Sequence, residues 1–171
     1  RVFWCTEKIC RDLKGKAVES KGGHAFMKET MRRVHGIYGA ENSAHHFFRD
    51  FSYCDSGMIP WLSVAQVMSE KGKHLGELVS EMEKEYPCSG EINLTIKDGA
   101  AVIEKVKEKY EKTAARIDLT DGIGVEFDNW RFNLRPSNTE PLIRFNMETK
   151  GDRALLEEKK KEVMDFIHSV E

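Results

Sequence analysis

A change of pattern at residues 87–90, Pro-Cys-Ser-Gly, constrains the fold of this 171-residue chain more than any other feature. After it come short segments in which apolar and polar residues alternate, as they do in half-buried strands. These segments span residues 92–96, 117–119, 124–127, 130–134 and 142–147. The pairs Asp121-Gly122 and Asp128-Asn129 separate neighbouring segments and are typical of tight turns. The second half therefore predicts an antiparallel sheet, and residues 87–90 predict a linker between two domains, 1–86 and 87–171.

Two helices accompany these strands. One is predicted over residues 100–112, with Val102, Val106 and Tyr110 on its apolar side. The other is predicted to begin after Asp152, a good helix cap, and to reach about residue 170. Because both apolar sides need cover, we expect a small α+β domain with its two helices on one face of the sheet.

The first half has mainly helical spacing. A helix capped by Thr6 and stopped by Gly15 is predicted first, and a buried stripe that includes Met58 and Leu62 marks a later one. The other predicted elements are a strand at 16–20, a helix at 25–34, a short buried strand at 37–38, an aromatic hairpin at 46–53, and helices at 56–69 and 75–86. The first strand and its helix form a βα unit whose neighbouring strands are expected outside this chain. This half is therefore predicted to be α/β.

Composition excludes several classes of function. The net charge of -2 provides no basic stripe for nucleic acid. The four cysteines lack a C-x-x-C pair, so we expect reduced, buried or half-buried thiols. No apolar run approaches the roughly 20 residues that span a bilayer, and the first residues lack a signal-peptide pattern. The sequence predicts a cytoplasmic protein without membrane or nucleic-acid partners.

The segment from Arg135 to Arg144, R-P-S-N-T-E-P-L-I-R, is the strongest candidate for a binding site. Arginine matches phosphate oxygens with a planar fork of donors. Ser, Asn and Thr add short donors and favour turns whose backbone N–H groups form a concave nest. Composition alone is equally compatible with an ordinary polar hairpin loop whose arginines are solvated.

A second block supports the first interpretation. The run Arg-x-Ser-Asn-Thr-Glu-Pro resembles the phosphate-binding loop of the α-D-phosphohexomutases, the phosphomannomutase and phosphoglucomutase family. Residues 39–48, G-A-E-N-S-A-H-H-F-F, resemble the sugar-recognition loop of that family, usually G-E-M-S-G/A-H, although Ala40 and Asn42 depart from it. Residues 49–61 further resemble the bacterial phosphomannomutase branch. Both motifs follow in family order.

The resemblance implies a fold and a set of binding residues. Residues 1–86 would be the C-terminal part of the third, sugar-recognition domain, an incomplete three-layer αβα domain. Residues 87–171 would be the fourth, phosphate-binding domain, a TBP-like antiparallel sheet with two helices on one face. The implied sugar-binding residues are His24, Glu41, Ser43 and His45, although Gly22 replaces the usual Thr before His24. The implied phosphate-binding residues are Arg135, Ser137, Asn138, Thr139 and Arg144.

The resemblance also implies a reaction. Enzymes of this family interconvert hexose 6-phosphates and hexose 1-phosphates through a phosphoserine and a bisphosphorylated intermediate, with Mg²⁺. No stretch here matches the phosphoserine motif or the D-G-D-x-D-R magnesium loop, so we expect no catalytic residue and no metal site in this chain. Its expected partners are hexose phosphates and the N-terminal domains of the same enzyme, and alone it is expected to be inactive. The alternative is a stand-alone phosphate-binding or regulatory module without catalysis.

Overall fold

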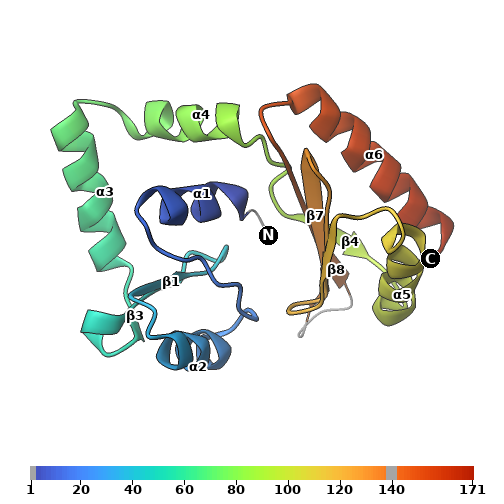
Figure 1. Ribbon diagram of the computed structural model, residues 1–171, viewed down its shortest axis with the longest axis horizontal. Coiled ribbons are helices and arrows are strands. Elements are labelled where there is room, and N and C mark those ends of the chain that lie inside the picture. The colour runs from blue at the N-terminus through green and yellow to red at the C-terminus, as the bar shows by residue number, and fades with distance from the viewer. Residues whose placement is uncertain (1–2, 138–141) are drawn as a thin grey trace. The chain divides into compact units, whose positions relative to one another are not determined.

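The computed structural model describes residues 3–137 and 142–171 and forms two compact units (Figure 1). One unit combines Arg1–Ala17 with Met82–Glu171, and the other is Val18–Glu81. The first helix of the chain thus packs with the second half of the sequence. These units group residues by contact, and the domain division between residues 86 and 87 stays a prediction.

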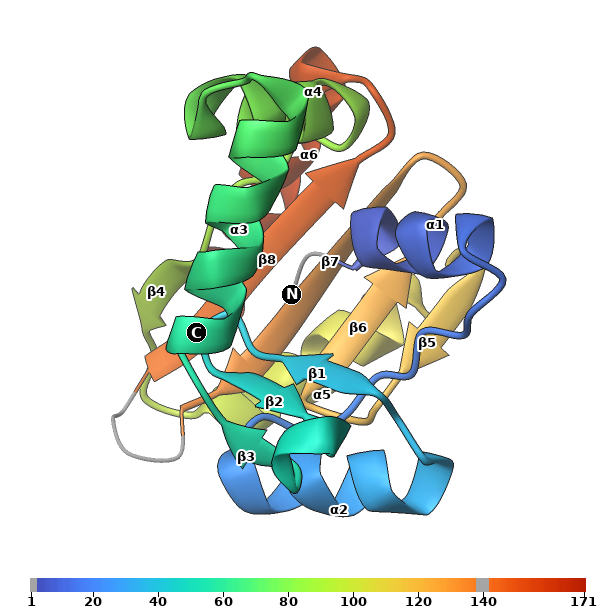
Figure 2. The ribbon, with the colours of Figure 1, turned by 90° about the vertical axis from the view of Figure 1, so that its left-hand side faces the viewer.

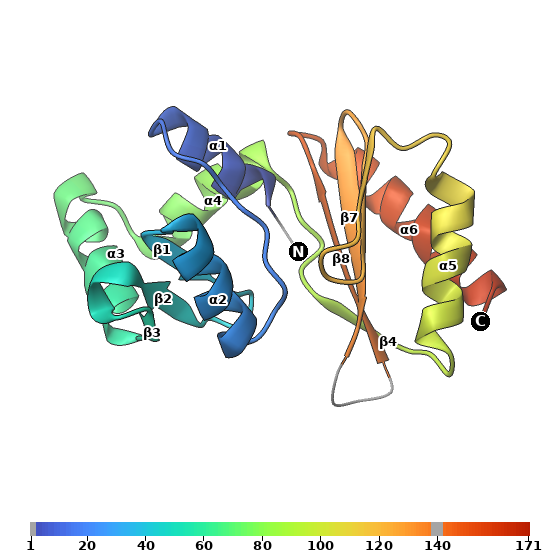
Figure 3. The same ribbon diagram turned by 60° about the horizontal axis from the view of Figure 1, so that its bottom comes forward.

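The larger unit is built on a five-stranded antiparallel sheet with strand order β4-β8-β7-β6-β5. The strands are β4 (Ile92–Thr95), β5 (Arg116–Asp118), β6 (Ile123–Glu126), β7 (Trp130–Pro136) and β8 (Leu142–Thr149). Helices α5 (Gly99–Tyr110) and α6 (Arg153–Ser169) cover one face (Figure 3). The predicted antiparallel sheet with two helices on one face is confirmed.

Alternation along the strands creates the core of this unit. Phe132 and Leu134 of β7 and Phe145 of β8 are fully buried against the two helices. Burial of each such side chain contributes roughly 1.5–3 kcal/mol. Asp98 and Asp152 cap the helices, because their carboxylates accept hydrogen bonds from the backbone N–H of Ala101 at 3.0 Å and of Leu155 at 2.8 Å.

Helix α1 (Trp4–Asp12) packs on the opposite face of the same sheet (Figure 2). Trp4 is buried, and its indole N–H donates to the carboxylate of Glu126 at 3.0 Å. The helix begins at Trp4 and not at Thr6, so Thr6 does not cap it. Lys14, with φ 59°, takes the left-handed position after the helix that the sequence assigned to Gly15.

The smaller unit holds a three-stranded antiparallel sheet beside helix α2 (Figure 2). Its elements are α2 (His24–Val34), β1 (Tyr38–Ala40), β2 (His46–Phe48), the 3₁₀ turn η1 (Arg49–Phe51), β3 (Cys54–Asp55) and α3 (Met58–Lys71). Helix α4 (Leu75–Glu85) runs from this unit into the larger one. The small core of the smaller unit consists of Met27, Met31 and Phe47.

Gly39 lets β1 lie directly on α2. A Cβ atom at this position would lie 2.8 Å from Sδ of Met31 and 2.9 Å from Sδ of Met27. Any side chain here would push the strand off the helix. The close approach fixes the start of the loop at 41–45 relative to the first turn of α2.

Several predictions for the first half are wrong. Residues 16–20 are irregular, because they join neither of the two sheets that the described residues form. Ile37 lies outside β1 and is 68% exposed, while the buried residue of that strand is Gly39. The predicted stripe of α3 is not buried: Met58 is 64% and Leu62 57% exposed, because no described segment covers this side of the helix.

The four cysteines are free, three half-buried and Cys54 exposed. Among the described residues, no helix combines the length and the apolar character that a membrane crossing would require.

Candidate functional site

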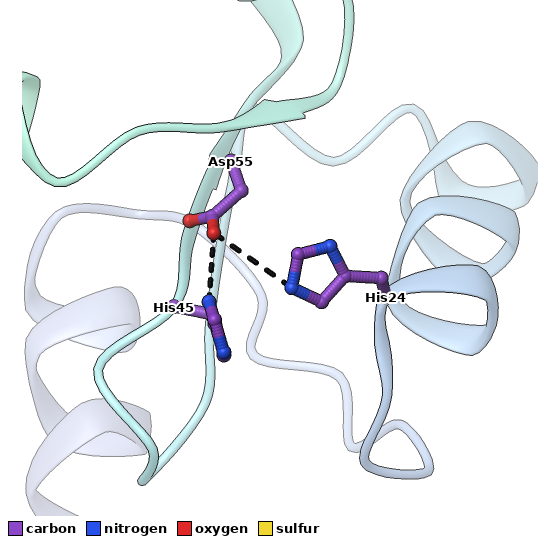
Figure 4. A group of neighbouring side chains, drawn as sticks. All are labelled: His24, His45 and Asp55. Carbon is purple, nitrogen blue, oxygen red and sulfur yellow. Dashed lines mark hydrogen bonds and ion pairs between the residues drawn. The ribbon is translucent and has the colours of Figure 1, made fainter.

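Three side chains that can bind ligands converge in the smaller unit (Figure 4). His24 is the first residue of α2, His45 immediately precedes β2, and Asp55 ends β3. Nδ1 of His45 lies 2.7 Å from Oδ2 of Asp55, and Nε2 of His24 lies 3.7 Å from the same oxygen. Figure 4 shows both imidazole rings directed at this carboxylate.

The carboxylate of Asp55 is fixed by the sheet as well as by the histidines. Its other oxygen, Oδ1, accepts a hydrogen bond from the backbone N–H of His46 at 2.8 Å. The hydrogen bond with the side chain of His45, followed by that with the backbone of His46, lowers the pKa of Asp55. An ionised carboxylate only accepts hydrogen bonds, so Nδ1 of His45 carries the proton and Nε2 remains available to a ligand.

Aromatic packing holds the two histidine rings in place. The ring of His24 meets that of Phe47 edge-on at 5.0 Å and that of His45 at 4.5 Å between centroids. Because Phe47 is fully buried in the small core, it is a fixed surface for His24. The small core that contains Phe47 therefore supports the site.

Glu41 belongs to the same region. Its Oε2 accepts a hydrogen bond from the backbone N–H of Gly23 at 3.0 Å, which ties the loop at 41–45 to the turn before His24. Its Oε1 is buried and has no hydrogen-bond partner among the described residues. A buried acceptor without a partner costs free energy, which a ligand hydroxyl would recover. Ser43 lies at the exposed tip of this loop, where Ala44 takes a left-handed conformation with φ 62°.

Arg135 and Arg144 of the predicted phosphate-binding loop lie in the larger unit, directly opposite each other in the β7–β8 ladder. The backbone N–H of Ser137 donates to the carbonyl of Leu142 at 2.8 Å and closes the end of the ladder. The segment between the arginines joins the last two strands, as predicted. Asn138 and Thr139 lie outside the described residues.

Two carboxylates stand beside these arginines. Glu91 is 3.6 Å from Nη2 of Arg135 and 3.4 Å from Nη1 of Arg144, and Asp121 is 3.9 Å from Nη1 of Arg135. Like charges directly opposite in a sheet repel each other, and Glu91 offsets that repulsion. Both arginines are only partly buried, so their guanidinium groups are accessible to an incoming anion.

Arg131 is a further arginine of β7, and its side chain is not solvated. It is buried on the face covered by α1, with Nε 3.7 Å from Oε1 of Glu148 and its guanidinium 5.3 Å from the ring of Phe3. Its role among the described residues is to hold α1 on the sheet.

Sequence reasoning missed three acidic residues of these sites. The sequence offered Asp55 or Ser56 as the cap of the helix predicted at 56–69. Helix α3 begins at Met58, and the hydroxyl of Ser56 accepts a hydrogen bond from the backbone N–H of Ile59 at 3.4 Å, whereas Asp55 faces the histidines. Glu91 and Asp121 carried no signal apart from their position beside the linker and in a turn. Only the pairing of strands brings them to the arginines.

Comparison with known proteins identifies the family. Residues 2–86 match the family described as phosphoglucomutase/phosphomannomutase, alpha/beta/alpha domain III, and residues 91–166 match its C-terminal domain. The chain is 50% identical over 169 residues to a phosphomannomutase of Salmonella montevideo and 48% identical over 167 residues to the phosphohexose mutases of Xanthomonas campestris. These matches cover 99% and 98% of this chain but 37% of each relative.

A solved structure supports the fold. A phosphoglucomutase/phosphomannomutase family protein from Burkholderia thailandensis superposes with a TM-score of 0.75 at 20% identity, over 96% of this chain and 35% of that chain. The chain thus spans little more than a third of its relatives. It belongs to the phosphoglucomutase/phosphomannomutase family and comprises that family's domain III and C-terminal domain, as the two motifs predicted.

Proposed function

We propose that this chain binds the sugar and the phosphate of a hexose phosphate within a longer phosphohexomutase. That enzyme would interconvert hexose 6-phosphate and hexose 1-phosphate, with mannose phosphates as substrates. The paired arginines Arg135 and Arg144 support the proposal most directly, because two opposed cations that share the carboxylate of Glu91 are suited to exchange that contact for a phosphate. Asn138 and Thr139 would add donors to this anchor.

The smaller unit supplies the sugar side. Oε1 of Glu41 can accept a hydrogen bond from a hydroxyl, while Nε2 of His45 and the hydroxyl of Ser43 can contact neighbouring ones. His24 would complete this set. A site that pairs acceptors with donors at fixed positions discriminates strongly against ligands without matching hydroxyls. It would contact the 3- and 4-hydroxyls, which are alike in mannose and glucose, so both sugars are suitable.

The phosphoryl group itself would be handled elsewhere in the longer protein. Two Asp-Gly pairs occur here, Asp98-Gly99 and Asp121-Gly122, and neither continues as the magnesium loop does; in the second pair, Asp121 faces Arg135. These residues do not fit a Mg²⁺ site, which needs several oxygen ligands. We propose that the phosphoserine and the Mg²⁺ ligands lie outside this chain, which contributes binding energy that positions the reacting end of the substrate. The enzyme would be cytoplasmic.

Calorimetric titration with mannose 1-phosphate tests this function. The Arg135→Ala variant is expected to bind at least about tenfold more weakly than the parent chain, because a charge-assisted hydrogen bond contributes about 1.5–3 kcal/mol. Arg153→Ala, at an exposed position of the same unit, is the matched control and should bind like the parent. Equal affinities for the two variants would refute the phosphate anchor.

A second titration separates the mutase from the alternative of a stand-alone phosphate-binding module. A module that recognises phosphate alone would bind inorganic phosphate as well as mannose 1-phosphate, and Glu41→Gln would leave both affinities unchanged. A hexose-phosphate site predicts that Glu41→Gln weakens only mannose 1-phosphate, because the variant alters the buried acceptor for a hydroxyl.

The exposed apolar side of α3 suggests where the rest of the longer protein packs. Met58, Trp61 and Leu62 are all more than half exposed, an arrangement that soluble proteins usually cover. We expect this chain to bind more of a hydrophobic fluorescent dye per molecule than a full-length relative does, and Leu62→Lys to reduce that binding. Equal dye binding by the two proteins would show that this side stays uncovered.

A further inference from the structure

We propose that His24, His45 and Asp55 form a binding site for a divalent transition metal ion of the Zn²⁺ class. Together they are the one group of three or more metal-ligating side chains that the described residues bring within 4.8 Å of one another, atom to atom. The inference depends on these three side chains alone and not on the proposed mutase activity. It also departs from the expectation that this chain holds no metal.

The donor set selects the class of metal. Two imidazole nitrogens with one carboxylate oxygen suit Zn²⁺, Co²⁺ and Ni²⁺, whereas Mg²⁺ and Ca²⁺ require mostly oxygen ligands. With bonds of about 2.0–2.1 Å, the donors of a tetrahedral ion lie about 3.3 Å apart. The observed spacings from Oδ2 of Asp55, 2.7 Å to His45 and 3.7 Å to His24, bracket this value. Small side-chain rotations would therefore bring the donors to the geometry that the ion needs.

The backbone already holds the donors in position. They come from the first turn of α2, the residue before β2 and the end of β3, and β2 and β3 are paired directly. The hydrogen bond from the backbone N–H of His46 to Oδ1 of Asp55 turns Oδ2 toward the histidines. Such second contacts to a ligating carboxylate are what orient it in known metal sites. His24 is held against the buried ring of Phe47.

Proton balance is straightforward. The metal replaces the proton that Nδ1 of His45 shares with Asp55, and exchange with water returns that proton to Nε2, so a neutral imidazole ligates the ion without net loss. All three side chains remain partly exposed, which leaves at least one coordination position to water or another ligand. The site is thus of the open kind. If the proposed function holds, the ion would also compete with sugar hydroxyls at His45.

A titration of the chain with Co²⁺ tests the site, because cobalt reports tetrahedral nitrogen and oxygen ligation by its visible absorption. We expect one saturable equivalent per chain. His24→Ala is expected to weaken it at least about tenfold, by analogy with the effect of lost supporting groups in metal sites. The side chain of His24 contacts the carboxylate of Asp55 and the ring of Phe47, so its removal should leave the backbone of this unit in place, which circular dichroism would verify.

Two matched controls exclude other ligands. His74→Ala removes an exposed histidine of the same unit, and Cys54→Ser removes the exposed thiol beside Asp55. Both variants should bind Co²⁺ like the parent chain, and Zn²⁺ should displace the Co²⁺. Absence of saturable binding in the parent, or a folded His24→Ala variant that binds as tightly, would overturn the proposal. So would loss of binding in Cys54→Ser, which would point to a thiolate site.

Discussion

Replacement of Glu148 by alanine is expected to lower the free energy of unfolding by roughly 3–5 kcal/mol, the typical cost of breaking a buried ion pair by removing one partner. Glu148 is fully buried on the face of the sheet that α1 covers. Its Oε1 accepts hydrogen bonds from the backbone N–H groups of Phe3 at 2.6 Å and Trp4 at 3.2 Å, and lies 3.7 Å from Nε of Arg131. Alanine would leave the two N–H donors without this acceptor and would remove the carboxylate beside the buried cation of Arg131.

Urea unfolding of the parent chain, Glu148→Ala and Glu148→Gln measures the effect. Glutamine keeps an acceptor of nearly the same shape and removes only the charge, so it should lose less stability than alanine does. Equal losses for the two variants would mean that the hydrogen bonds to Phe3 and Trp4 contribute nothing, and that only the ion pair matters.

Burial also makes the contribution of Glu148 depend on pH. Desolvation raises the pKa of Glu148 above its ordinary value of 4.5, although hydrogen bonds from Phe3 and the charge of Arg131 act in the opposite direction. Between 4.5 and the raised pKa the folded state binds more protons than the unfolded state. The stability that comes from the raised pKa of Glu148 is therefore fully present below pH 4.5, and it decreases as the pH rises through the pKa of the folded state. The parent should gain stability relative to Glu148→Gln as the pH falls through this window.

The second half of the fold could be predicted from the sequence because each strand carries its own signal. Phe132 and Leu134 alternate with Arg131 and Asn133, and the apolar pair belongs to the core, although all four residues are buried. The boundaries were within a few residues for every strand of the sheet. The burial of the other face of the sheet, which α1 covers, was not predictable. Arg131 is buried there by Glu148 and α1, and both are distant from it in sequence.

The first half was predicted less well because its apolar residues do not all face a core within this chain. Met58 and Leu62 have the spacing of a buried helical stripe, and spacing alone cannot show what covers them. Ile37 was likewise predicted to be buried from its apolar character, and it is exposed.

The candidate site was predictable only where a motif named its residues. His45 and Glu41 were identified by resemblance, and their role as a sugar site stays a prediction. In the structure Glu41 accepts a hydrogen bond from Gly23, beside His24, and His45 contacts Asp55. Asp55 was missed because it reaches His45 only through a tight return of the chain, in which Ser52 and Tyr53 both take left-handed conformations with φ 55° and 59°. Neither residue type favours that region, so the turn has no sequence signature.

The second large effect is expected for Gly122→Ala, with a loss of roughly 2–6 kcal/mol, since steric strain of the backbone and overpacking each cost about 1–3 kcal/mol. Gly122 has a φ of +73°, which disfavours any side chain. A Cβ atom here would lie 2.1 Å from the carbonyl oxygen of Leu134 and 2.7 Å from Cα of Arg135. The turn must therefore move away from β7, and Asp121 with it.

Gly151→Ala separates the two causes. Gly151 has nearly the same conformation, φ +68°, but a Cβ atom there would meet nothing within 4 Å. Its replacement should cost only about 1–2 kcal/mol, the ordinary penalty of a left-handed residue. Urea unfolding of both variants gives the difference in stability, and titration with mannose 1-phosphate shows whether Gly122→Ala alone weakens binding at Arg135. Equal effects of the two substitutions would mean that the close contact of this turn with β7 neither stabilises the sheet nor positions Arg135.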